Sequence, residues 1–277
     1  MTANAAQQLL RDQIRHLYEE REASAIAQWV VEDLTGTTRA DRLLRDPELT
    51  EEQTEIFERS SQQLQAGVPM QYVLGYAMFM GLQFSVNHHV LIPRPETEEL
   101  VQWLLETAPK EARILDIGSG SGCIPIVISK QRPEASVTSM DVSANALAVA
   151  KENATRLNAR VHWVEGDFLD LSVQELLDHP TVIISNPPYI PFSDKDTMAA
   201  HVVDHEPHVA LFVPDHDALK FYRAIIGYGS RYGVTEFFFE THYQLAQQVA
   251  GLGQGSGYRA EVRKDLGGNE RMVRLMR

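Results

Sequence analysis

The sequence predicts an α/β protein: a mostly parallel, seven-stranded, doubly wound sheet with a terminal antiparallel hairpin, plus a small N-terminal all-α bundle joined to it by a β-hairpin. Three observations carry this prediction. From about residue 112, strand-like and helix-like segments alternate, which is typical of a parallel sheet covered on both faces. The last two strand-like runs have no helix between them. The first 68 residues show helical spacing and no strand pattern.

Composition limits the class of protein. The chain has 277 residues, of which 44% are hydrophobic and 23% charged, as in ordinary globular proteins. The single cysteine, Cys123, excludes an intramolecular disulfide and a cysteine-based zinc cluster. No apolar run reaches the roughly 18 residues of a membrane span, and the N-terminus lacks the basic region of a secretory signal. The net charge of −13 argues against salt-driven binding to nucleic-acid phosphates. We therefore expect a cytoplasmic enzyme with no membrane partner and no direct nucleic-acid binding.

Residues 1–68 are predicted to form about four helices. Leu9, Leu10, Ile14 and Leu17 recur at helical spacing. A capping box of Thr50 and Gln53 precedes the apolar residues of another helix, and Gly67 can end it. This stretch carries 7 basic and 13 acidic residues. We interpret it as a helical substrate-binding domain.

Residues 69–92 change to a β-rich composition broken by Gly75 and Gly81. This pattern predicts a β-hairpin linker. Pro93 and Pro95 then impose an extended exit before a helix over residues 96–106. In the remaining domain, 93–277, strands are predicted at 113–117, 136–141, 161–165, 181–185, 235–240, 258–263 and 271–276. Helices are predicted at 122–131, 144–157, 172–178, 217–229 and 242–251.

A glycine-rich turn follows the first of these strands. It contains Gly118, Ser119, Gly120, Ser121 and Gly122, directly after an apolar strand that includes Asp116. Glycine lets the backbone approach a ligand and adopt positive φ. The spacing is G-x-G-x-G and not the G-x-G-x-x-G of dinucleotide-binding proteins, because Cys123 stands where the third glycine of that motif would be. With the preceding aspartate, it is similar to motif I of S-adenosylmethionine (SAM) methyltransferases.

Asp141 ends the next strand, 19 residues after Gly122. A carboxylate in this position is placed to accept hydrogen bonds from both hydroxyls of a ribose. It could instead cap the following helix, but Ser143 is better placed to do so. After the third strand, Asp167 could accept a hydrogen bond from an adenine amino group, or Phe168 could cover the ring. We expect one or both to border the adenine.

The segment Asn186-Pro187-Pro188-Tyr189 follows the apolar strand 182–185. Its prolines fix a rigid exit at the carboxyl edge of the sheet, where α/β proteins bind ligands. The Asn186 oxygen and a backbone carbonyl can each accept one hydrogen of a planar NH2 group, and Tyr189 can cover its face. This arrangement suits methylation of an amide or an aromatic amine, because it orients a delocalised lone pair without removing a proton.

Together these residues resemble class I SAM-dependent methyltransferases with a Rossmann-like fold. The NPPY segment is shared by DNA adenine-N6 methyltransferases and protein glutamine-N5 methyltransferases. Other segments are similar to the HemK-type family of peptide chain release factor glutamine methyltransferases: 69–75, 79–81, 91–98, 206–211, 221–223 and 264–271. Residues 214–219 depart from the more glycine-rich turn that is usual there.

The resemblance implies that methyl is transferred from SAM, giving S-adenosyl-L-homocysteine, to the side-chain N5 of the glutamine in the GGQ motif of release factors. It implies that residues 118–122, Asp141, Phe168 and Asn186 bind SAM. It also implies that Asn186, Pro187, Pro188 and Tyr189 bind the glutamine amide, with Asn186, Pro187 and Tyr189 catalytic. The partner would be a release factor.

Alternatives remain. A DNA or RNA amino-methyltransferase would use the same chemistry but would need a basic groove or a target-reading domain. A binding module with an inactive fold would have no need of all three motifs. A metal hydrolase could use His201, His205 and His208, but the sequence lacks the glutamate of H-E-x-x-H, and we expect no metal. Arg94, Glu96 and Glu98 could line the mouth of the site or only begin a solvated helix.

Overall fold

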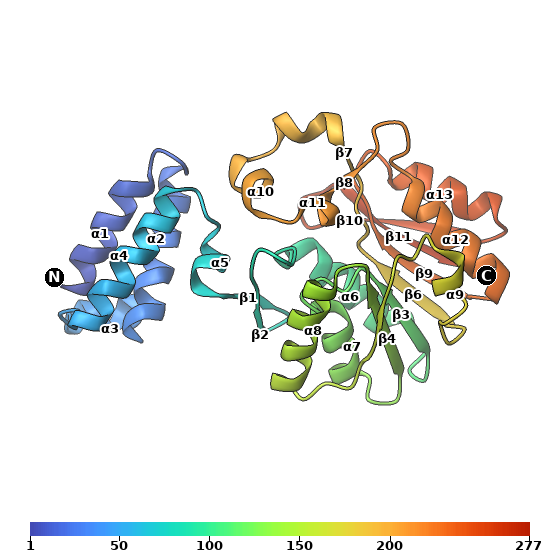
Figure 1. Cartoon of the computed structure of the whole chain (residues 1–277), viewed down its shortest axis with the longest axis horizontal. Helices are drawn as coiled ribbons and strands as arrows, with labels where there is room; N and C mark the ends of the chain where they lie inside the picture. The colour runs from blue at the N-terminus through green and yellow to red at the C-terminus, as the bar shows by residue number, and fades with distance from the viewer. The chain divides into compact units, whose positions relative to one another are not determined.

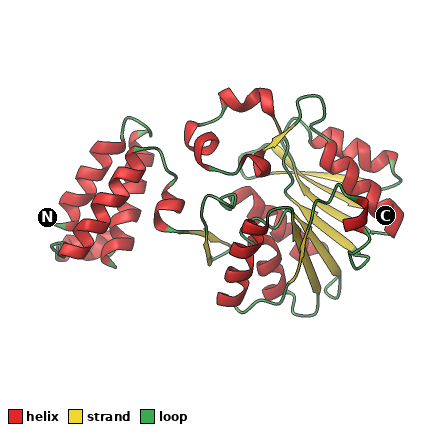
Figure 2. Cartoon of the chain, in the orientation of Figure 1, coloured by secondary structure: helices red, strands yellow, loops and turns green.

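The computed structural model describes all 277 residues and divides them into two compact units. The helical unit comprises Met1–Tyr76 with Ala199–His205, and the sheet unit comprises Ala77–Met198 with Glu206–Arg277. Figure 1 labels the elements of both. Figure 2 shows that the regular structure of the N-terminal part is helical and that the large sheet belongs to the other unit. No helix of the chain is both long and apolar enough to cross a membrane.

The helical unit has one apolar core, built mainly from its first, second and fourth helices. Leu10 and Ile14 of the first helix and Val31 of the second are fully buried in it. Thr50 and Gln53 form the predicted capping box, each side chain accepting a hydrogen bond from the other's backbone N–H. The helices are α1 (Ala3–Ile14), α2 (Glu20–Thr35), α3 (Arg39–Leu44), α4 (Glu51–Gln65), α5 (Met70–Leu74) and α10 (Ala200–His205).

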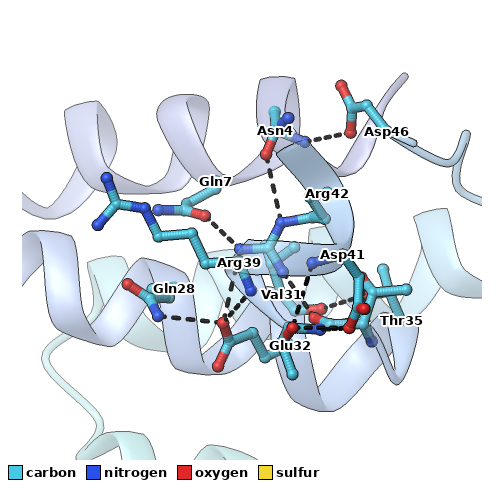
Figure 3. A network of polar contacts seen from close by, with 12 residues as sticks. Asn4, Gln7, Gln28, Val31, Glu32, Thr35, Arg39, Asp41, Arg42 and Asp46 are labelled. Carbon is cyan, nitrogen blue, oxygen red and sulfur yellow. Dashed lines mark hydrogen bonds and ion pairs between the residues drawn. The ribbon is translucent and has the colours of Figure 1, made fainter. Parts of the chain in front are cut away.

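A buried arginine fastens the short helix α3 to α1 (Figure 3). Arg42 is 2% exposed. Its guanidinium donates to Asn4 Oδ1 at 3.2 Å, Gln7 Oε1 at 2.7 Å and the Thr37 carbonyl at 2.8 Å. Glu32 lies 3.9 Å away and supplies a compensating charge. The fork of donors suits arginine, because a buried charge must be paired and hydrogen-bonded.

The prediction of β structure from residue 69 onward is wrong for its first part. Residues 70–74 form α5, with Pro69 before the helix and Gly75 after it at φ +78°. Proline fixes a φ suited to the start of a helix, and glycine accepts the left-handed cap, so the two outweigh the β-rich composition between them. Strands are confined to β1 (Tyr76–Phe79) and β2 (Leu82–Ser85), which form a two-stranded sheet.

The sheet unit has the predicted seven-stranded sheet, in the order β10-β11-β9-β6-β3-β4-β5. β3, β4, β5, β6 and β9 are parallel, whereas β10 and β11 form the terminal antiparallel hairpin, with β11 pairing antiparallel to β9. The bounds are β3 (Arg113–Ile117), β4 (Ser136–Asp141), β5 (His162–Glu165), β6 (Val182–Ser185), β9 (Glu236–Glu240), β10 (Arg259–Lys264) and β11 (Glu270–Met276).

Alternate residues of these strands enter two different cores, as the period of a strand requires. Ile114 packs in a cluster with residues of α6 and α7, whereas its neighbour Leu115 packs with residues of α12 and α13. Figure 1 shows these helices on opposite sides of the sheet. The bounds are α6 (Pro95–Thr107), α7 (Cys123–Gln131), α8 (Ala144–Arg156), α12 (Lys220–Tyr232) and α13 (Ala246–Gly255).

Helix limits differ from prediction at several places. The helix predicted at 172–178 is only α9 (Leu171–Gln174), while α12 and α13 begin and end three or four residues later than predicted. Gly233, at φ +79°, is the residue that ends α12. Between β6 and α12 the sequence predicted no element, but η1 (Phe192–Thr197), α10 and α11 (His208–Leu211) occur there. The segment also contains β7 (Ile190–Pro191) paired with β8 (Phe212–Val213).

Candidate functional site

The topology brings four predicted motifs to one edge of the sheet. In the sheet, β4 and β5 lie on one side of β3, and β6 and β9 lie on its other side. The strand order therefore reverses between β3 and β6. Ligands of open α/β sheets bind outside the carboxyl ends of the strands at such a reversal. A cavity of about 290 Å³ lies there. Its walls include Gly118 and Gly120, Asp141, residues 166–169 and Asn186, Pro187 and Pro188.

The glycine turn after β3 has a conformation that other residues rarely adopt. Gly118, Gly120 and Gly122 have φ values of +92°, +51° and +81°. The N–H groups of Gly118 and Ser119 both donate to the Met140 carbonyl, which ties the turn to β4. A Cβ at Gly122 would lie 3.1 Å from the Cβ of Ala150, so this glycine also permits close packing. The turn presents Gly118 and Gly120 to the cavity; Ser119, Ser121 and Gly122 do not line it.

Behind the turn lies a buried polar chain. The hydroxyls of Ser119 and Ser139 are 2.6 Å apart, and Ser139 donates to Asp116 Oδ2 at 2.6 Å. Burial raises the pKa of Asp116 to about 8, with the Asp141 charge acting in the same direction and the Ser139 hydrogen bond opposing it. Asp116 is therefore mostly protonated at neutral pH, and this chain supports the shape of the turn from beneath.

Asp141 is held at the cavity wall by backbone donors. Gly120 N–H donates to its Oδ2 at 3.0 Å, and Ser143 N–H donates to its Oδ1 at 2.9 Å. Burial raises its pKa, although both bonds oppose the shift. Ser143 caps α8 by accepting from Ala146 N–H, as predicted. The Asp141 carboxylate is therefore fixed in place without being the cap, and each oxygen retains lone-pair capacity for a further donor.

The structure brings both candidate adenine neighbours to the cavity. Phe168 is 4% exposed and meets Tyr228 edge to face, with ring centroids 5.5 Å apart. Asp167 is exposed, and its Oδ1 accepts from Leu169 N–H at 2.9 Å. Both residues line the wall after β5. Phe168 offers a rigid apolar surface, and Asp167 offers a free carboxylate oxygen.

Three residues of the Asn186–Tyr189 segment reach the cavity. Asn186, Pro187 and Pro188 line it, whereas Tyr189 packs against the core between the sheet and α12. The Tyr189 ring lies 6.2 Å from the His242 ring. Burial, with the charge of Glu240, raises the Tyr189 pKa well above its ordinary value, so the phenol is neutral. Tyr189 therefore offers no anionic base for an amide nitrogen.

No sequence motif predicted the residues that hold this segment from behind. Asn186 Nδ2 donates to Thr97 Oγ1 at 3.2 Å, and Thr97 Oγ1 donates to Glu240 Oε2 at 2.6 Å. Both Thr97 and Glu240 are buried. The available signal was Glu240 itself, a charged residue that ends the aromatic strand β9 next to β6. Such a residue at the carboxyl edge of a buried strand is seldom without a specific partner.

The charged residues at the start of α6 do not line the cavity. Arg94 forms an ion pair with buried Glu206 at 2.5 Å, and Glu206 Oε2 also accepts from Ile92 N–H. Glu98 Oε1 accepts from Met80 N–H at 2.6 Å. These contacts fix the entry into α6. No group of three His, Cys, Asp or Glu side chains in the chain is arranged to hold a metal ion.

Comparisons with known proteins identify two family domains and a related fold. Residues 6–75 match the PrmC N-terminal domain model, and residues 95–209 match the Methyltransferase small domain model. The fold resembles that of the hMettl16 catalytic domain in complex with MAT2A 3'UTR hairpin 6 (TM-score 0.55, 14% identity, covering 82% of this chain and 81% of that one). It also resembles a methyltransferase from Pyrococcus furiosus (TM-score 0.50, 14% identity, covering 82% and 98%).

Relatives with curated names extend over nearly the whole chain. The release factor glutamine methyltransferase of Flavobacterium psychrophilum is 36% identical over 269 residues, covering 94% of this chain and 93% of the relative. That of Bacteroides thetaiotaomicron is also 36% identical, covering 95% and 96%. That of Streptococcus pneumoniae is 39% identical, covering 81% and 80%. With the seven-stranded sheet and the motifs gathered at its carboxyl edge, these relationships show that the chain belongs to the release factor glutamine methyltransferase family.

Proposed function

We propose that this protein transfers the methyl group of SAM to the side-chain N5 of the glutamine in the GGQ motif of peptide chain release factors. The observation that carries the proposal is the wall of one cavity, where the glycine turn and Asp141 stand beside Asn186 and the two prolines. The names of the relatives support the substrate. From this substrate we infer a cytoplasmic location.

The residues present fit SAM. A Cβ at Gly118 would point toward the Asn186 carbonyl oxygen, 4.0 Å away, so the missing side chain leaves space between the two motifs. Gly118 and Gly120 would face the methionine and ribose side, Asp141 would accept from the ribose hydroxyls, and Phe168 or Asp167 would border the adenine. When bound, SAM supplies an electrophilic methyl carbon on a sulfonium, which is a good leaving group.

Asn186 and Pro187 would hold the glutamine amide. The Asn186 oxygen and the Pro187 carbonyl would each accept one N–H hydrogen, which turns the nitrogen lone pair toward the methyl carbon. Tyr189 packs against the core outside the cavity lining, so it would support this segment and would not act as a base on the amide. After the new N–C bond forms, the nitrogen releases one proton to solvent, and the product is the N5-methyl amide. Orientation and charge placement, not a general base, carry the rate.

We propose that residues 1–68 bind the release factor, that residues 69–92 link the two domains, and that residues 93–277 carry the SAM site. The first 68 residues have no cluster of chemically active side chains, and their acidic surface offers a charged face to a protein partner.

The experiment is a mass measurement on a release factor incubated with the enzyme and SAM. We expect a gain of ~14 Da, located by fragmentation to the GGQ glutamine; SAM transfers one methyl in place of one hydrogen. A release factor with the glutamine replaced is the matched control and should gain nothing. An adenine-containing oligonucleotide should also remain unmodified. Methylation of the oligonucleotide but not of the release factor would overturn the proposal.

A further inference from the structure

Asn186 is held from behind by a two-step hydrogen-bond chain. Its Nδ2 group donates to Thr97 Oγ1 at 3.2 Å, and the Thr97 hydroxyl donates to Glu240 Oε2 at 2.6 Å. Thr97 lies in the first turn of α6 and is 4% exposed; Glu240 ends β9 and is 2% exposed. Register places Phe239 opposite Ser185, so Glu240 and Asn186 leave adjacent strands side by side. We call these three residues the relay.

When Glu240 is ionised, the hydrogen bonds of the relay can be donated in one direction only, from Asn186 to Thr97 and from Thr97 to Glu240. An ionised carboxylate can only accept hydrogen bonds, so the single hydroxyl proton of Thr97 must point to Glu240. Thr97 then has only lone pairs to offer Asn186, which must present its NH2 group. The amide oxygen of Asn186 is left as the end available to a ligand in the cavity that Asn186 lines.

Hydrogen bonds donated in the opposite direction, from Glu240 through Thr97 to Asn186, would be unfavourable for the reaction. If Glu240 were a donor, the Thr97 proton could turn toward the Asn186 oxygen. The Asn186 amide would then be stabilised in the flipped state, with its NH2 group facing a substrate that itself presents N–H donors. Two donors facing each other cannot form a hydrogen bond.

We propose that Glu240 is a positioning residue which, through Thr97, fixes the side-chain amide of Asn186 with its oxygen toward the substrate nitrogen. This inference deepens the proposed methyl transfer and rests on it for its kinetic consequence, but the orientation of Asn186 can be measured without any substrate.

Burial raises the pKa of Glu240 to about 7, so the carboxylate form that sets the direction of the relay becomes dominant as pH rises above neutral. The Thr97 hydrogen bond and the charges of Arg271 and Arg94 oppose this rise, and the charge of Glu96 adds to it. The phenols of Tyr189 and Tyr222 also face Glu240. Tyr222 donates its hydroxyl to the Glu240 backbone carbonyl, not to the carboxylate. Thr97 is therefore the specific donor to Glu240 Oε2.

The first test follows the side-chain NH2 group of Asn186 by NMR on asparagine-labelled enzyme, with the signal assigned by its absence from Asn186→Ala. Between pH ~6 and ~8.5 the parent signal should shift with a midpoint near the Glu240 pKa. Glu240→Gln and Thr97→Val should abolish the titration, and Thr97→Ser should restore it. Glu236→Gln, at the other end of β9, is the matched control and should titrate like the parent. An Asn186 signal that is insensitive to Glu240→Gln and Thr97→Val would overturn the relay.

The second test is single-turnover methylation of a release factor by the same variants. Thr97→Val should slow transfer about 10- to 100-fold, because a misplaced reacting group costs on that order, while release-factor and SAM affinities stay within about twofold. Glu240→Gln should give a rate that no longer rises with pH. A parental rate and pH profile in Glu240→Gln would contradict the proposal. If the parent methylates no release factor, the proposed function fails, but the NMR result still decides the relay.

Discussion

Individual side chains at the cavity carry separable tasks, which substitution can distinguish. In the proposed reaction, Asn186 would act by orientation, and Asp141 would accept hydrogen bonds from SAM in the part of the cavity formed by the glycine turn. Asp116 lies beneath that turn and does not line the cavity. We therefore predict an effect on the methylation rate for Asn186, on SAM affinity for Asp141 and on protein stability for Asp116.

Asn186→Ala should lower the single-turnover rate by about 10²–10³, the usual cost of one positioned hydrogen bond in a dry site. Asn186→Asp should also be slow, because it removes the NH2 donor to Thr97 and adds a charge beside the sulfonium. Release-factor affinity, measured in parallel, should change far less. Transfer by Asn186→Ala at the parental rate would show that a general base elsewhere performs the reaction.

Asp141→Ala should weaken SAM binding, since each hydrogen bond to a charged group contributes about 1.5–3 kcal/mol. Calorimetry with SAM measures this directly. Glu152→Ala, on the exposed surface of α8, is the matched control and should bind like the parent. Unchanged affinity in Asp141→Ala would remove Asp141 from the binding site.

Asp116 should make the protein less stable as pH rises. Its pKa is raised to about 8 in the folded state, so between the ordinary carboxyl range and pH 8 the unfolded chain binds fewer protons. The free energy of unfolding then falls with pH across that window and levels off above it. Asp116→Asn cannot ionise, so its stability relative to the parent should grow by about 2–5 kcal/mol between pH ~5 and ~8.5. Chemical denaturation at several pH values tests this; a constant difference would contradict it.

At the scale of elements, the short helix α3 depends on one arginine. Alone, six residues are too few for a stable helix. Arg42 connects it to α1 through Asn4 and Gln7, and to the preceding loop through the Thr37 carbonyl.

Arg42→Lys should therefore destabilise the helical unit by about 1–3 kcal/mol, because one ammonium cannot satisfy all three acceptors and leaves buried groups unpaired. Hydrogen exchange of the α1 and α3 amides would report the loss locally. The exposed Arg39→Lys is the control and should leave exchange unchanged. Equal protection in both variants would mean that α3 does not depend on the three hydrogen bonds of Arg42.

At the scale of the whole molecule, the two units have separate cores and separate expected tasks. The sheet unit contains two hydrophobic clusters of its own, one on each face, and every residue that lines the cavity. The helical unit contains a third cluster and none of the cavity lining.

Deleting residues 1–68 should leave SAM affinity within about twofold of the parent and remove release-factor methylation, because most of the area needed to hold a protein partner would be lost. Circular dichroism and calorimetry with SAM would establish that the remaining chain is folded. Full methylation by the truncated enzyme would show that the helical unit is not the substrate clamp.

Features that depend on neighbouring residues could be predicted from the sequence. The strand–helix alternation, the Thr50–Gln53 capping box, the positive-φ glycine turn and the terminal hairpin are all encoded within short windows. Because carboxyl ends of parallel strands share one edge, the sequence also predicted that the turn, Asp141, Phe168 and Asn186 would meet there.

The side chains that support that edge, in contrast, come together only through long-range packing. Thr97 and Asn186 are 89 residues apart in the chain, and Thr97 and Glu240 are 143 apart. Their contact depends on the register of β6 against β9 and on how α6 packs against the sheet, which no local pattern specifies. Composition likewise suggested a strand at residues 70–74, where the caps at Pro69 and Gly75 bound a helical turn. Local propensity is worth tenths of a kcal/mol per residue, so packing and chain geometry override it.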